Sequence, residues 1–173
     1  MSASSIQRLA WPTPVLKALW LLVFVSGVGI LALIVFSFVA EARLIAYLGS
    51  LQADLDGATL LVWMRVAAGI GLLMLPLFHI VLTRLLAIVD TVRLGDAFVP
   101  ENAVRLKQAA LASLGLQLLD LAFGVLASAL SSGKAQIEWS FSVTSWILVV
   151  LLFVLASVFE QGARMRQDLE GTV

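Results

Sequence analysis

Four long apolar runs dominate this sequence and restrict its fold more than any other feature. They cover residues 18–40, 58–82, 109–130 and 139–159. An α-helix rises about 1.5 Å per residue, so about 20 apolar residues cross the roughly 30 Å hydrocarbon core of a bilayer. We therefore predict an all-α integral membrane protein in which residues 1–173 form one domain, a bundle of four transmembrane helices.

The composition supports a membrane protein and argues against other classes. Hydrophobic residues make up 61% of the chain and charged residues 13%, whereas soluble domains are about half apolar and a quarter charged. The 11 basic and 11 acidic residues balance, so no net charge attracts nucleic acid, and we expect no direct nucleic-acid binding. Without cysteine and with a single histidine, the chain is predicted to hold no metal or other cofactor.

The first apolar run has an alternative explanation as a cleaved signal peptide. Ala40, Glu41 and Ala42 resemble a small-residue cleavage site. The apolar core of a signal peptide has about 7–15 residues, and the run over 18–40 is longer. We therefore favour a membrane span.

Residues 41–57, between the first two runs, show a weaker helical pattern. Leucines recur at steps of four, three and four along one face: Leu44, Leu48, Leu51 and Leu55. This spacing predicts an extension of the first span or a helix lying at the membrane interface, with a break at Gly49–Ser50.

The second apolar run continues as a helical pattern to Leu94, where Gly95 is typical of a helix C-cap. Pro100 then suits the first position of a new helix, and Glu101 favours its positive end. The second and third helices should therefore extend out of the membrane and meet in a hairpin tip, residues 94–107. We expect Phe98 to pack the turn against the new helix.

Basic residues are unevenly distributed between the two sides of the predicted membrane. One side would hold Arg8, Lys17, Arg84, Arg93, Arg105, Lys107, Arg164 and Arg166. The other side would hold only Arg43 and Lys134. The positive-inside rule then predicts that both termini and the hairpin tip are cytoplasmic.

Two charged residues lie within apolar runs, Arg65 and Asp120. Ionisable groups inside a membrane are costly unless they are paired, and they are candidates for function. Their estimated depths in the membrane are similar enough to predict an ion pair between them. This pair could be architectural or part of a proton or ion path. His79, near the inner end of the second run, could be an interfacial residue or a pH-sensitive one.

Motifs of the common enzyme classes are missing. The chain contains no phosphate-binding loop, nucleophile elbow, HExxH sequence or pair of catalytic carboxylates. We therefore expect no catalytic residues and no enzymatic activity.

Two short segments resemble a known family. They are GDAFVPEN at 95–102, followed by Arg105–Leu106, and a tail that begins with FEQGA at 159–163 and runs to Val173. Together with the spacing of four spans, they resemble the bacterial membrane family called domain of unknown function 2975. The resemblance implies a multi-pass protein of the bacterial cytoplasmic membrane, often paired with a small helix-turn-helix regulator.

These observations lead to two functional hypotheses. The first is a non-catalytic regulatory or sensor protein that docks a cytoplasmic DNA-binding regulator. The alternative is that the same residues only cap helices and anchor them in the lipid headgroups. The candidate docking residues are Gly95, Phe98, Pro100, Glu101, Asn102, Arg105, Phe159 and Gly162. The second is a small transporter or channel that uses Arg65 and Asp120 and assembles as a homo-oligomer, because one protomer is small for a pore.

Overall fold

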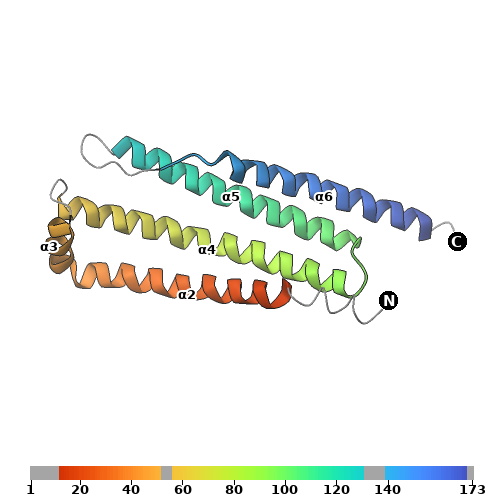
Figure 1. Ribbon diagram of the computed structural model, residues 1–173, viewed down its shortest axis with the longest axis horizontal. Coiled ribbons are helices and arrows are strands. Elements are labelled where there is room, and N and C mark those ends of the chain that lie inside the picture. Colours follow the sequence, from red (N-terminus) through yellow and green to blue (C-terminus); the bar gives the residue numbers. More distant parts are fainter. Residues whose placement is uncertain (1–11, 52–55, 131–138, 171–173) are drawn as a thin grey trace. The chain divides into compact units, whose positions relative to one another are not determined.

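In a computed structural model, the described residues 12–51, 56–130 and 139–170 form five α-helices and no strand (Figure 1). The helices are α2 (Pro12–Val39), α3 (Glu41–Leu51), α4 (Gly57–Arg93), α5 (Pro100–Leu130) and α6 (Val143–Glu170). The predicted all-α class is confirmed. Predictions that concern Arg8, Leu55, Lys134 and the last three residues of the tail lie outside the described residues.

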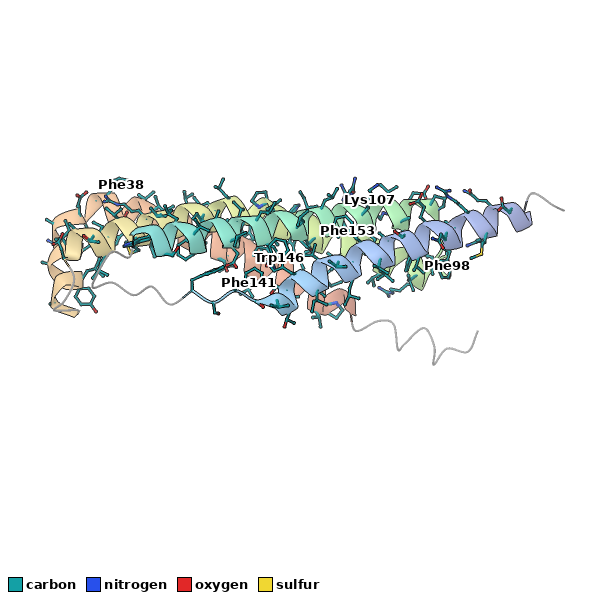
Figure 2. All side chains as sticks on the ribbon, turned by 90° about the horizontal axis from the view of Figure 1, so that it is seen from above. Phe38, Phe98, Lys107, Phe141, Trp146 and Phe153 are labelled. Atoms are coloured by element: carbon teal, nitrogen blue, oxygen red, sulfur yellow. The ribbon has the colours of Figure 1, made fainter. Side chains whose placement is uncertain are left out.

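Four of the helices are long and apolar enough to cross a membrane. The qualifying stretches are Pro14–Val39, Gly57–Arg93, Pro100–Ser128 and Val143–Asp168. Large apolar side chains stand exposed along them, such as Phe38, which is labelled in Figure 2 and is 62% exposed, and Val150, which is 60% exposed. Lipid is an apolar solvent, so these exposed faces suit a multi-pass membrane protein with the predicted number of spans.

Three predicted boundaries differ from the structure. Helix α2 begins at Pro12, because proline has no N–H and is tolerated in a first helical turn. Helix α3 passes through Gly49 and Ser50 without a break, and the Ser50 hydroxyl donates to the Tyr47 carbonyl at 2.6 Å. Helix α6 begins only at Val143, directly after Ser142, a residue type favoured immediately before a helix.

The chain divides into two compact units, which we describe separately. Unit 1 contains Met1–Val23, Leu77–Gln117 and Val143–Val173, and unit 2 contains Phe24–Pro76 and Leu118–Ser142. Unit 1 thus holds the second half of α4, the first half of α5 and all of α6. Unit 2 holds α3 with the first half of α4 and the last part of α5.

The core of unit 1 consists mainly of small residues on α5 and α6. Its buried apolar side chains are Leu82, Ala103, Leu106, Ala109, Ala110, Ala112, Val149, Ala156 and Ala163. A Cβ atom added to Gly115 would lie 3.1 Å from Leu77 Cδ1, so α4 and α5 also approach closely there. Small side chains allow such close approach between helices in membranes.

In unit 2, glycines likewise allow α2 and α4 to approach each other closely. A Cβ atom on Gly27 would lie 2.9 Å from Leu75 Cδ1, and one on Gly71 would lie 3.3 Å from Ile30 Cδ1. A Cβ atom on Gly29, by contrast, would meet nothing within 4 Å. The short helix α3 lies across the ends of α2 and α4 (Figure 1).

The connection between α4 and α5 begins with a Schellman motif. Gly95 has a φ of 89°, which a residue without a Cβ atom adopts at little cost. The Asp96 N–H donates to the Thr91 carbonyl at 3.1 Å, and the Gly95 N–H donates to the Val92 carbonyl at 3.0 Å. The predicted C-cap at Gly95 and the predicted helix start at Pro100 are both confirmed.

Candidate functional site

The two segments that carry the family resemblance meet within unit 1. The Phe98 and Phe159 rings lie 5.3 Å apart between centroids, and Phe98 lies beside α6 (Figure 2). A Cβ atom on Gly162 would lie only 2.7 Å from Phe98 Cδ1. Phe98 therefore packs on α6, where Gly162 leaves space for the ring, a contact that the expected packing on α5 did not include.

An ion pair makes a second link between the same segments. Arg166 Nη1 on α6 is paired with Asp96 Oδ1 in the α4–α5 connection. Both side chains are nearly half exposed. The pair therefore contributes little to stability, and its main effect is to align α6 with the α4–α5 connection. Sequence reasoning did not single out this pair, although opposite charges in two segments predicted on one side of the membrane were a usable signal.

Asn102 is the centre of a buried polar network. Its side chain is 0% exposed, and its Nδ2 donates to Thr91 Oγ1 at 2.7 Å and to the Ala97 carbonyl at 2.9 Å. Its Oδ1 accepts from Arg105 Nη1 at 2.9 Å. The Thr91 hydroxyl then donates to the Ile88 carbonyl at 2.8 Å. One amide thus joins the end of α4, the connection and the start of α5.

The eight candidate docking residues all lie in unit 1, but they have different roles. Gly95 and Pro100 shape the connection. Asn102 and Arg105 are committed to the internal network, and Glu101 is exposed. Helix capping and internal packing therefore account for most of these residues, and the exposed surface around them is what a partner could contact.

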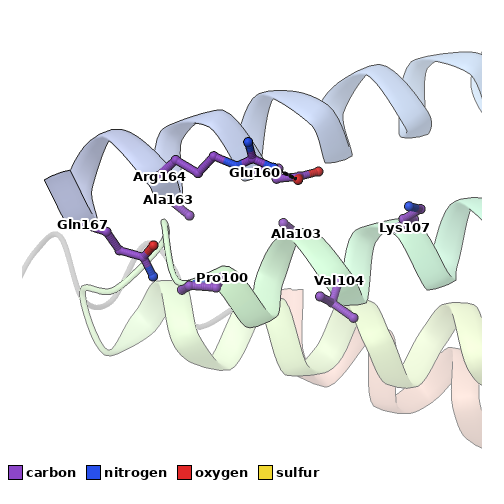
Figure 3. Close-up of a pocket in the computed structure, with 8 residues that line it drawn as sticks. All are labelled: Pro100, Ala103, Val104, Lys107, Glu160, Ala163, Arg164 and Gln167. Carbon is purple, nitrogen blue, oxygen red and sulfur yellow. Dashed lines mark hydrogen bonds and ion pairs between the residues drawn. The ribbon is translucent and has the colours of Figure 1, made fainter.

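A groove lies between α5 and α6 next to this junction (Figure 3). Its volume is about 360 Å³, and it is lined by Pro100, Ala103, Val104, Lys107, Glu160, Ala163, Arg164 and Gln167. Arg164 Nη2 donates to Glu160 Oε1 at 2.6 Å, an ion pair between residues one helical turn apart. Lys107 has no ion pair with another described residue. The groove therefore combines an alanine floor with a rim of mixed charge.

Arg65 has different partners from the one predicted. Its Nη2 donates to Glu41 Oε2 at 3.0 Å and to the Ser37 carbonyl at 2.7 Å, and its Nε donates to Ser37 Oγ at 3.1 Å. Its guanidinium carbon also lies 4.1 Å from the centre of the Phe38 ring. These contacts satisfy the charge at the α2–α3 end of unit 2.

Asp120 forms no ion pair with Arg65, and the part of the chain that the structure describes offers it no other salt bridge. The reason is the direction in which helical side chains lean, which is toward the N-terminus of their own helix. Arg65 therefore reaches toward the start of α4, near Glu41. Asp120 leans toward the start of α5, away from that end of unit 2.

His79 bonds to a tryptophan of α2. Trp20 Nε1 donates to His79 Nδ1 at 2.9 Å, and the rings lie 6.0 Å apart between centroids. Since the indole N–H can only donate, Nδ1 must be the unprotonated acceptor nitrogen in this geometry. The bond joins α2 to α4 within unit 1.

The described residues contain no group of three or more histidine, cysteine, aspartate or glutamate side chains placed to hold a metal ion. Comparisons of the chain with protein-family models, curated proteins and solved structures find no match. The functional argument therefore depends on the sequence and the geometry of this chain.

Proposed function

We propose that this chain is a non-catalytic, multi-pass membrane protein that docks a cytoplasmic protein partner. Its docking surface would be the α4–α5 connection together with the C-terminal part of α6. The distribution of basic residues supports a cytoplasmic position for this surface and for both termini. The family resemblance supports a bacterial cytoplasmic membrane and a small helix-turn-helix regulator as the partner.

The observation that carries this proposal is apolar exposure outside the predicted spans. Leu94 is 86% exposed at the start of the connection, and Met165 is 63% exposed on α6. Both belong to segments that Asp96, Arg166 and Phe98 hold together. Exposed apolar side chains on an ordered polar segment are characteristic of interaction surfaces.

A photo-crosslinking experiment tests the proposal. A photoreactive residue at Leu94 should capture one small DNA-binding protein in native membranes, and Met165→Ser should abolish that capture while the protein stays folded. The same photoreactive residue at Val150, which is 60% exposed on the apolar part of α6, is the control and should capture lipid. Capture of only lipid, or of a second copy of the chain, at Leu94 would contradict the proposal.

The transporter hypothesis has less support than docking. It required Arg65 and Asp120 to form one intramembrane pair, and Arg65 bonds to Ser37 and Glu41 instead. We therefore propose docking and not transport.

A further inference from the structure

A second groove lies within unit 1, between α4 and α5. Its volume is about 370 Å³, and it is lined by Leu77, Ile80, Arg84, Gln108, Leu111 and Ala112. Four of these side chains are apolar, and the two polar ones are an arginine and a glutamine. The volume lies within the roughly 300–1,000 Å³ typical of sites for small molecules.

The polar end of the groove carries uncompensated positive charge. Arg84 is exposed and forms no hydrogen bond or ion pair with another described residue. No acidic side chain lines the groove. Arg105, one turn before Gln108 on α5, bonds to the neutral oxygens of Asn102 and Ala87 and has no acidic partner among the described residues.

The position of this charge along the helices matches the edge of a bilayer. Arg84 follows the end of the second apolar run at residue 82, and Gln108 precedes the start of the third run at residue 109. Leu77, Ile80 and Leu111 lie on the apolar side of this boundary. The groove thus has a cationic end at headgroup depth and apolar walls at acyl-chain depth, whichever side of the membrane it faces.

We propose that this α4–α5 groove binds one anionic phospholipid. The Arg84 guanidinium would hold the lipid phosphate through two parallel N–H donors, and the Gln108 amide would donate a further hydrogen bond. One acyl chain would lie over Leu77, Ile80 and Leu111. Basic pockets between membrane helices bind anionic headgroups in this way. The proposal is independent of the docking function, which uses the connection and α6.

Native mass spectrometry of the purified full chain tests the proposal with defined lipids. The protein should retain one phosphatidylglycerol about five to ten times more strongly than phosphatidylcholine with the same acyl chains. Arg84→Gln should remove this preference. Leu111→Trp should reduce retention while keeping the charge, because Leu111 is 53% exposed and a larger side chain would fill the groove.

Two controls separate a site from general surface charge. Lys107→Gln removes one charge at the same depth from the neighbouring α5–α6 groove, and Val150→Trp adds the same bulk on another lipid-facing surface. Both variants should keep the wild-type preference. The proposal would be overturned if the wild type retained the two lipids equally. It would also be overturned if Lys107→Gln reduced the preference for phosphatidylglycerol as much as Arg84→Gln does. Displacement of the lipid by millimolar inorganic phosphate would also overturn it, because the site would then be for a soluble anion.

Discussion

The two units each hold an arginine in a polar cluster, but the clusters differ in what they leave available. In unit 2, Arg65 is bonded to a carboxylate and to both oxygens of Ser37. In unit 1, the partners of Arg105 among the described residues are the neutral oxygens of Asn102 and Ala87. The first cluster pairs its arginine with a carboxylate, whereas the second leaves its arginine without an acidic partner in the described part of the chain. An arginine that is paired within the chain stabilises the structure, whereas an arginine without an acidic partner is available to bind an anionic ligand.

The largest expected effect is at the centre of the unit 1 cluster. Asn102→Leu should lower the free energy of unfolding by about 3 kcal/mol, because Thr91, Ala97 and Arg105 would lose their partner in a buried place. Denaturation in detergent micelles would measure the change. Glu101→Gln, at the exposed neighbour, should stay within about 0.5 kcal/mol of the wild type. Equal effects of the two substitutions would show that the network is not a stability centre.

The contact between Phe98 and Gly162 should have the next largest effect. Gly162→Ala should destabilise the protein by about 1–2 kcal/mol, because the new Cβ atom would overlap the Phe98 ring. Gly29→Ala is the matched control, since a Cβ atom there meets nothing within 4 Å and alanine favours a helix by about 0.5–1 kcal/mol. Adding Phe98→Leu to Gly162→Ala should restore part of the loss, and failure of this rescue would remove the packing explanation.

A double-mutant cycle tests the ion pair of Arg65 in unit 2. Arg65→Gln and Glu41→Gln should show a coupling energy of about 0.5–1 kcal/mol, as expected for a half-exposed ion pair. Arg65→Gln and Asp120→Asn should be additive within error, because these two residues do not meet. Measured coupling between Arg65 and Asp120 would revive the intramembrane pair and, with it, the transport hypothesis.

The smallest effect concerns the Trp20–His79 bond. The bond is exposed, so its contribution should be about 0.5 kcal/mol, at the low end for a neutral hydrogen bond. Trp20→Phe keeps an aromatic ring and removes the indole donor, so it should lower the free energy of unfolding by this amount. Denaturation in detergent micelles would measure the change. An effect as large as that of Asn102→Leu would show that Trp20 stabilises the fold through more than this bond.

Local patterns were sufficient to predict several features of the fold. Apolar run length predicted the four spans, since hydrocarbon thickness sets the length of a helix that crosses it. The Gly95 cap and the Pro100 start were predictable because they depend on the backbone of one or two residues. The ion pair between Glu160 and Arg164 is likewise local, because the two residues lie one helical turn apart.

Contacts between distant segments were decided by the tertiary structure. The sequence placed Arg65 and Asp120 at compatible depths, but depth does not specify the direction in which a side chain leans, and Arg65 reaches Glu41 instead. Likewise, Phe98, Asn102 and Asp96 were recognised within a motif, whereas their partners Phe159, Thr91 and Arg166 required the helices to be brought together. Sequence by itself determined the helices and made four of them long and apolar enough to cross a bilayer. The folded chain decided which charges are satisfied, because that depends on the acceptors that packing brings within hydrogen-bonding distance.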